Sequence, residues 1–78
     1  MFSSRLRSAR NANSYTQQRM SDMLGITLNS YQKYEQGTRC PSFDLLVQIA
    51  DILDVSIDYL LGRDEWLASH GVSFDELP

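Results

Sequence analysis

Apolar residues recur along this sequence at spacings of three and four, which is typical of helices with one buried face. No stretch alternates apolar and polar residues over enough positions to predict a strand. The longest apolar runs contain three residues, so neither a membrane-spanning helix nor the core of a signal peptide is expected. The pattern therefore predicts an all-α domain.

Residues that cap helices divide the chain into five predicted helices. A serine or threonine precedes each helix, where its side-chain oxygen can accept a hydrogen bond from the first turn. A glycine, or a residue that tolerates left-handed backbone, follows most of them. The predicted N-caps are Ser3 or Ser4, Thr16, Thr27, Ser42 and Ser56. The predicted ends are the turn-forming cluster at 11–14, Gly25, Gly37, Asp54 and Gly62.

The apolar spacing also predicts which side chains face inward. They are Leu6, Ala9 and Asn13 in the first helix, Met20, Met23 and Leu24 in the second, and Leu46, Ile49, Ala50 and Leu53 in the fourth, while the fifth carries Ile57, Leu60 and Leu61. Together they predict one compact five-helix domain over residues 1–62. Residues 63–78 are expected to form a short C-terminal tail that acts in dimerisation or as a linker. Its large aromatic residues, Trp66 and Phe74, are expected either to fold back on the fifth helix or to contact a second subunit.

The third predicted helix, TLNSYQKYEQG at 27–37, has two different sides. Successive helix residues lie about 100° apart around the axis. With Leu28 at 0°, Tyr31 and Tyr34 fall at roughly 300° and 240°, on the side expected to pack against the core. The opposite arc holds Leu28, Asn29, Gln32, Lys33 and Gln36.

This second arc is rich in side-chain amides, which present a donor and an acceptor together. That pair matches the N6/N7 edge of adenine in the major groove of DNA. A lysine can donate to guanine or to a phosphate, and a leucine can contact a thymine methyl group. From composition alone, an ordinary solvated helix face remains the alternative.

Charged residues are distributed unevenly along the chain. Residues 1–40 hold six of the seven basic residues and two acidic ones, for a net charge of +4. Residues 41–78 hold one basic and eight acidic residues, for a net charge of −7. The total of −3 therefore conceals a basic half, which favours an anionic partner for that half. A dipole without functional meaning is the alternative.

The reactive residue types are few. Cys40 is the only cysteine, which excludes an intramolecular disulfide and fits a reducing cytoplasm. With His70 as the only histidine, the ligands of a zinc site are also missing. The sequence contains no nucleophile–base pair, phosphate-binding loop or metal cluster, so we expect neither an enzyme nor a cofactor.

The run TQQRMSDMLGITLNSYQKYEQG, followed by TRCPS, resembles the helix-turn-helix of the phage repressor and Cro family, also called the xenobiotic-response-element type. The resemblance continues through LVQIADILDVSIDYLLG and covers about residues 3–62. It implies a repressor-type five-helix fold that binds double-stranded DNA as a dimer, with the third helix in the major groove. The sequence departs from the family pattern at Ser21, where a small alanine is usual.

The resemblance also implies roles for individual residues. Positions that read bases in the family correspond to Leu28, Asn29 and Lys33, with Gln32 a lesser candidate. Positions that contact or border phosphates correspond to Gln17, Thr27, Gln36, Thr38 and Arg39. Arg10 and Glu35 correspond to a family ion pair that joins the first helix to the third.

These observations predict a cytoplasmic, sequence-specific transcriptional regulator, specifically a homodimeric repressor of a phage, prophage or bacterial locus. No membrane association is expected. The alternative is an antitoxin-like interaction module that holds a protein partner through its acidic C-terminal half and can also bind its own operator.

Overall fold

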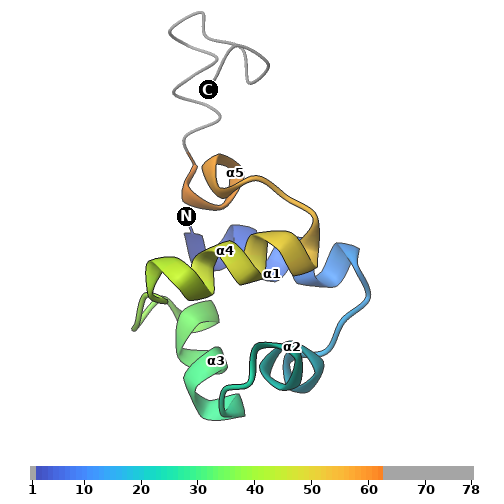
Figure 1. Ribbon diagram of the computed structural model, residues 1–78, viewed down its shortest axis with the longest axis vertical. Helices are drawn as coiled ribbons and strands as arrows, with labels where there is room; N and C mark the ends of the chain where they lie inside the picture. The colour runs from blue at the N-terminus through green and yellow to red at the C-terminus, as the bar shows by residue number, and fades with distance from the viewer. Residues whose placement is uncertain (1, 63–78) are drawn as a thin grey trace, which may run out of the picture.

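The computed structural model describes residues 2–62, and within that range it consists of five α-helices joined by short loops (Figure 1). These are α1 (Phe2–Ala12), α2 (Gln17–Leu24), α3 (Leu28–Gln36), α4 (Phe43–Leu53) and α5 (Ile57–Leu61). The predicted all-α, five-helix architecture is confirmed for these residues. The predicted tail, with Trp66, His70 and Phe74, lies outside the described residues.

Four of the predicted N-caps are confirmed by their hydrogen bonds. Each side-chain hydroxyl accepts from the backbone N–H three residues later: Thr16 from Arg19, Thr27 from Ser30, Ser42 from Leu45, and Ser56 from Tyr59. The predicted cap of the first helix at Ser3 or Ser4 is wrong, because α1 already includes Phe2 and both serines lie inside it.

The predicted helix ends after α2, α3, α4 and α5 are also confirmed. Gly25 and Gly37 adopt left-handed backbone at φ of 68° and 78°, a conformation that costs glycine little. Asp54 takes the same conformation at φ of 54°, where its short polar side chain is tolerated. These turns set the directions in which α3, α4 and α5 leave.

The core consists of the apolar side chains predicted to face inward, together with both tyrosines of α3. Tyr31 is fully buried and Tyr34 is 7% exposed. Two predicted positions, Met23 and Ile57, are only partly buried against this core, and two more lie outside it. Leu61 is 47% exposed, and Asn13 lies at the surface, where its amide donates to the Ala9 and Leu53 carbonyls at 2.9 and 3.1 Å. Asn13 thus links the ends of α1 and α4 without entering the core.

The packing leaves α2 and α3 together at one end of the domain, as Figure 1 shows, and α5 at the other. In the middle, α1 packs against both α3 and α5, while α4 packs against α2 and α5. None of the helices in residues 2–62 is long and apolar enough to cross a membrane. The arrangement presents the outer faces of α2 and α3 side by side.

Candidate nucleic-acid interface

The outer face of α3 is the amide-rich arc identified in the sequence. Asn29 and Gln36 are exposed, and Leu28, Gln32 and Lys33 are half-buried. The tyrosines on the opposite side anchor α3 in the core. Because the core holds one side of this helix, the amide-rich side is presented outward in a fixed orientation.

The turn between α2 and α3 is held by local hydrogen bonds. The backbone N–H of Ile26 donates to the Ser21 carbonyl at 3.1 Å, and Ile26 packs against the core. The Ser21 side chain is fully buried, and its hydroxyl donates back to the Gln18 carbonyl at 2.8 Å. This bond satisfies the buried hydroxyl, so serine is accommodated at this position.

A buried ion pair fixes α3 to α1. Arg10 donates from Nε to Oε2 of Glu35 at 2.6 Å and from Nη2 to Oε1 at 3.1 Å. The Glu35 side chain is 1% exposed and that of Arg10 is 13% exposed. Arg10 also donates to the Tyr15 carbonyl at 2.9 Å, so one guanidinium joins α1, the loop before α2, and α3.

The charge state of this pair follows from its surroundings. Burial alone would raise the pKa of Glu35, but hydrogen bonds from Arg10 and Gln17 hold that pKa below its ordinary 4.5. The neighbouring Tyr31 hydroxyl is buried without a hydrogen bond of acceptable geometry. Burial, followed by the nearby carboxylate, raises the pKa of Tyr31, which therefore stays neutral. Glu35 remains the anion of this cluster at neutral pH.

The lowered pKa of Glu35 predicts a loss of stability in acid. The unfolded chain binds a proton at Glu35 at a higher pH than the folded chain does, so the carboxylate contributes stability above pH 4.5 that is lost as pH falls through the folded pKa. Urea unfolding of the parent and of Glu35→Gln should therefore show a large difference at pH 6 and a smaller one at pH 3. A difference that grows in acid would contradict this.

Two glutamines extend the ion pair towards the surface. Gln17 donates from Nε2 to Oε1 of Glu35 at 3.2 Å, and Gln32 donates from Nε2 to Oε1 of Gln17, also at 3.2 Å. The structure therefore brings together Gln17, Gln32 and Glu35, for which the sequence predicted separate roles. Both glutamines are half-buried, at the contact between α2 and α3.

The remaining predicted phosphate contacts are spread around the ends of α3. The Thr27 hydroxyl caps the helix and donates to Oγ of Ser30 at 3.0 Å, so a phosphate contact through it requires that proton to switch partner. Thr38 donates to the Lys33 carbonyl at 3.3 Å. Gln36 is exposed in the last turn of α3, and Thr38 and Arg39 are exposed just after that turn.

Sequence reasoning missed Arg7. Its Nη2 donates to the backbone carbonyl of Glu35 at 3.1 Å, and its Nε lies 3.7 Å from Oε1 of Glu35. A cation at the carbonyl end of a helix is favourable. The sequence did contain a signal for this contact. Arg7 lies three residues before Arg10 in α1, and residues three apart share a helix face, so both can reach Glu35.

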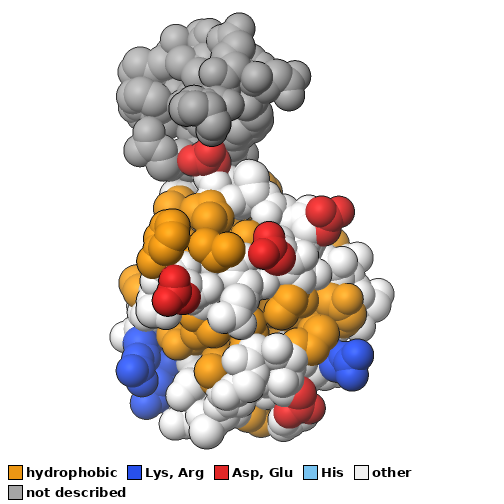
Figure 2. All heavy atoms as spheres, in the orientation of Figure 1, with side chains coloured by type: hydrophobic (Ala, Val, Ile, Leu, Met, Phe, Trp, Pro, Cys, Tyr) orange, Lys and Arg blue, Asp and Glu red, His pale blue; other side chains and the backbone are white. Residues whose placement is uncertain are grey.

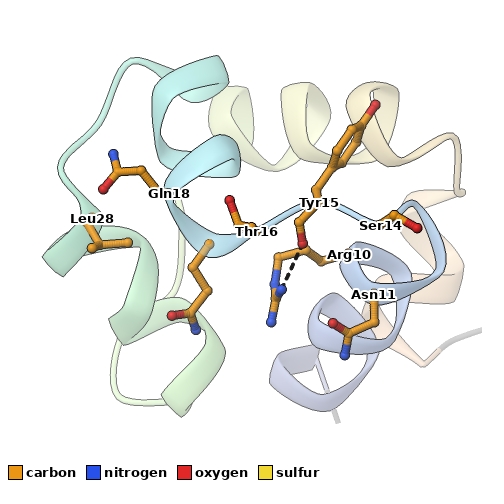
Figure 3. A pocket seen from close by; sticks show the side chains of 8 residues that line it. Arg10, Asn11, Ser14, Tyr15, Thr16, Gln18 and Leu28 are labelled. Carbon is orange, nitrogen blue, oxygen red and sulfur yellow. Dashed lines mark hydrogen bonds between the residues drawn. The ribbon is translucent and has the colours of Figure 1, made fainter.

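An open groove of about 630 Å³ lies beside the start of α2 (Figure 3). It is lined by the end of α1, the loop to α2, the first residues of α2, and Leu28 of α3. Figure 3 shows the Leu28 side chain directed towards this space from α3. The free N–H groups of the first turn of α2 make such a place suitable for an anion.

Basic side chains flank this end of the molecule. Figure 2 shows them on both sides at the level of α2 and α3, whereas most acidic side chains in view lie over α4 and α5. Lys33 and Arg39 form no ion pair with another residue in the range 2–62. The α2–α3 end therefore combines available cations with exposed amides.

Comparison with known proteins places this geometry in a family. The model of the helix-turn-helix family matches residues 6–60, which include α2, the turn and α3. The chain belongs to this family. The resemblance found in the sequence, to helix-turn-helix regulators of the xenobiotic-response-element type, is confirmed by this match and by the relatives' names.

Several helix-turn-helix proteins are similar over most of this chain. YqaE of Bacillus subtilis, an uncharacterized HTH-type transcriptional regulator, is 51% identical over 61 residues, which are 78% of this chain and 53% of YqaE. The cryptic phage CTXphi transcriptional repressor RstR of Vibrio cholerae is 51% identical over 59 residues, or 76% and 53% of the two chains. The SPbeta prophage-derived regulator YonR of Bacillus subtilis is 48% identical over 61 residues, or 78% and 56%. This chain thus spans about half the length of these relatives.

Proposed function

We propose that this protein is a sequence-specific regulator of transcription that binds double-stranded DNA, with α3 in the major groove. The observation that carries the proposal is the exposed, amide-rich face of α3 on a helix-turn-helix scaffold. Lys33 lies on this face and Arg39 follows just after the helix, and neither has an ion-pair partner among residues 2–62. A helix of this kind fits the width of the major groove, where base edges carry a distinct donor and acceptor pattern.

Base reading is assigned to Leu28, Asn29 and Lys33. Asn29 occupies the second position of α3 and is exposed, so its short amide reaches a base edge when the start of the helix enters the groove. Leu28 offers an apolar contact suited to a thymine methyl group. Lys33 lies one helical turn beyond Asn29 and suits guanine.

Phosphate contacts are assigned to the flanks of the same face. Gln17 lies at the first position of α2, beside the open groove. Thr27, Gln36, Thr38 and Arg39 surround the two ends of α3. Such contacts hold the protein in register on DNA and carry little sequence information.

The regulator is proposed to act in the cytoplasm as a homodimeric repressor of a phage, prophage or bacterial locus. One relative is named a phage transcriptional repressor and another is named as prophage-derived, which supports this choice. A single α3 covers only about half of a site, and two-fold symmetry sets two such helices roughly 34 Å apart, or one turn of DNA.

The function is tested by selecting duplexes that bind the protein from a random-sequence library. Selection should enrich one sequence with two symmetric half-sites about one helical turn apart. Recovery of unrelated sequences, all bound with equal affinity, would contradict sequence-specific binding.

The assigned contacts predict two different mutant phenotypes. Asn29→Ala should weaken binding to the selected duplex by about 1–3 kcal/mol and leave binding to a scrambled duplex unchanged, because the substitution removes only an interaction with a base. Arg39→Ala should weaken binding to both duplexes alike. Titrations of both variants on both duplexes measure the difference.

Gln48→Ala provides the matched control, since Gln48 is an exposed amide on α4, outside the proposed interface. It should bind like the parent. If Asn29→Ala weakened both duplexes equally, the outer face of α3 would be a backbone-holding surface and the base readers would lie elsewhere.

A further inference from the structure

Gln32 and Gln17 form a chain of amides that ends on the buried carboxylate. Nε2 of Gln32 donates to Oε1 of Gln17 at 3.2 Å, and Nε2 of Gln17 donates to Oε1 of Glu35 at 3.2 Å. Arg10 donates one hydrogen bond to each oxygen of that carboxylate, so Oε1 accepts from both Arg10 and Gln17. The chain therefore runs from the outer face of α3, through the first residue of α2, to the ion pair that anchors α3.

The chemistry of the carboxylate fixes the direction of this chain. An ionised carboxylate can only accept hydrogen bonds, so the nitrogen of the Gln17 amide must face Glu35. The Gln17 oxygen then points away from the carboxylate and is met by the donor of Gln32. A flipped Gln17 amide would place its oxygen against Glu35 and its nitrogen against the donor of Gln32, and neither hydrogen bond could form.

This arrangement leaves Gln17 with one specific group for a ligand. An amide nitrogen carries two hydrogens, of which Glu35 accepts one. The second remains at the first position of α2, where Gln17 lines the open groove together with Thr16 and Gln18. An amide held at both its oxygen and its nitrogen presents this remaining donor without first having to be ordered, which favours an anionic acceptor.

We propose that Gln32 is a positioning residue that acts through Gln17: its hydrogen bond holds the Gln17 amide with an N–H group directed at a phosphate of bound DNA. This inference rests on the proposed DNA-binding function. It replaces the base-reading role that the sequence resemblance implied for Gln32. One of the two hydrogens on the Gln32 amide nitrogen is already committed to Gln17, which fixes the orientation of the Gln32 amide before DNA binds.

The two roles predict different binding behaviour for Gln32→Met, which keeps the length of the side chain and removes its donor. If Gln32 positions Gln17, the substitution should weaken binding to the selected and the scrambled duplex by the same factor. We expect about 2- to 10-fold, which corresponds to one neutral hydrogen bond. In a Gln17→Met background, Gln32→Met should have no further effect, because its effect passes through Gln17. Gln48→Met on α4 serves as the matched control and should bind like the parent.

If Gln32 read a base instead, Gln32→Met would weaken binding to the selected duplex alone. Equal and additive losses from Gln17→Met and Gln32→Met would show two independent contacts. Either result overturns the proposal.

A measurement without DNA separates this inference from the proposed function. In the unmodified protein, nitrogen relaxation should show the side-chain amides of Gln17 and Gln32 to be as ordered as the backbone, and that of Gln48 to be mobile. Gln17→Met should release the Gln32 amide. If the amides of Gln17 and Gln32 are as mobile as that of Gln48, the positioning role is overturned even where DNA binding is intact. If they are ordered but no duplex binds, the DNA-binding function fails instead.

Discussion

Replacing Glu35 with alanine is expected to lower the free energy of unfolding by about 3–5 kcal/mol. The substitution leaves the Arg10 guanidinium, 13% exposed, in a site built for a carboxylate. It also removes the acceptor of Gln17 and the carboxylate that lies 3.7 Å from Nε of Arg7. Since small domains have about 5–15 kcal/mol of stability in total, this one variant removes much of it.

A double-mutant cycle tests whether the pair itself is responsible. Arg10→Met together with Glu35→Leu should cost less than the sum of the single variants, because neither charge is then buried without its partner. Urea unfolding of the four proteins gives the free energies. Asp51→Ala, which removes an exposed carboxylate from α4, is the control and should change stability by no more than about 0.5 kcal/mol. Strictly additive losses would show that Arg10 and Glu35 do not stabilise each other.

Binding to DNA is expected to weaken about 10³-fold between 50 and 200 mM salt. If a dimer neutralises on the order of six phosphates, the slope of log affinity against log salt is roughly −5. The net charge of −3 does not prevent this. Counterion release depends on the cations that meet the phosphates, and the basic side chains in Figure 2 lie at the level of α2 and α3, away from most acidic side chains in that view.

The salt slope also identifies the residues that produce it. Arg39→Ala should make the slope less steep by about one for each phosphate that is no longer neutralised, whereas Asn29→Ala should leave it unchanged. Titrations of the selected duplex at four salt concentrations distinguish the two. Affinity that stays constant over this range would rule out phosphate-dominated binding.

Sequence reasoning succeeded where structure is determined by a few neighbouring residues. Thr16 and Thr27 could be assigned as caps because an N-cap bonds to a backbone group three residues away. The left-handed turn at Gly25 is likewise a local property. The same reasoning failed at Ser3, where the sequence offers adjacent serines and the helix simply begins earlier.

The amide chain could not be predicted in this way. Angles around α3 place Gln32 on the outer arc, but they do not say which outer residue meets a neighbouring helix. That depends on how closely α2 approaches α3, which the packing of the core decides. The partner of Gln32 lies 15 positions earlier in the chain, on a different helix. The contact between Arg10 and Glu35, which also lie far apart in the sequence, was predicted only because the family resemblance implied it.

The separation between the core and the outer face of α3 has a consequence for how such a regulator changes over generations. Within residues 2–62, Leu28, Asn29 and Lys33 belong neither to the buried core nor to the network around Glu35. If these three residues read bases as proposed, substitutions at their positions would change the preferred operator while leaving the core and the network around Glu35 intact. Gln32, although it lies among them, is tied to the scaffold. Divergent descendants of this protein should vary freely at 28, 29 and 33 while retaining 10, 17, 32 and 35 together as a group.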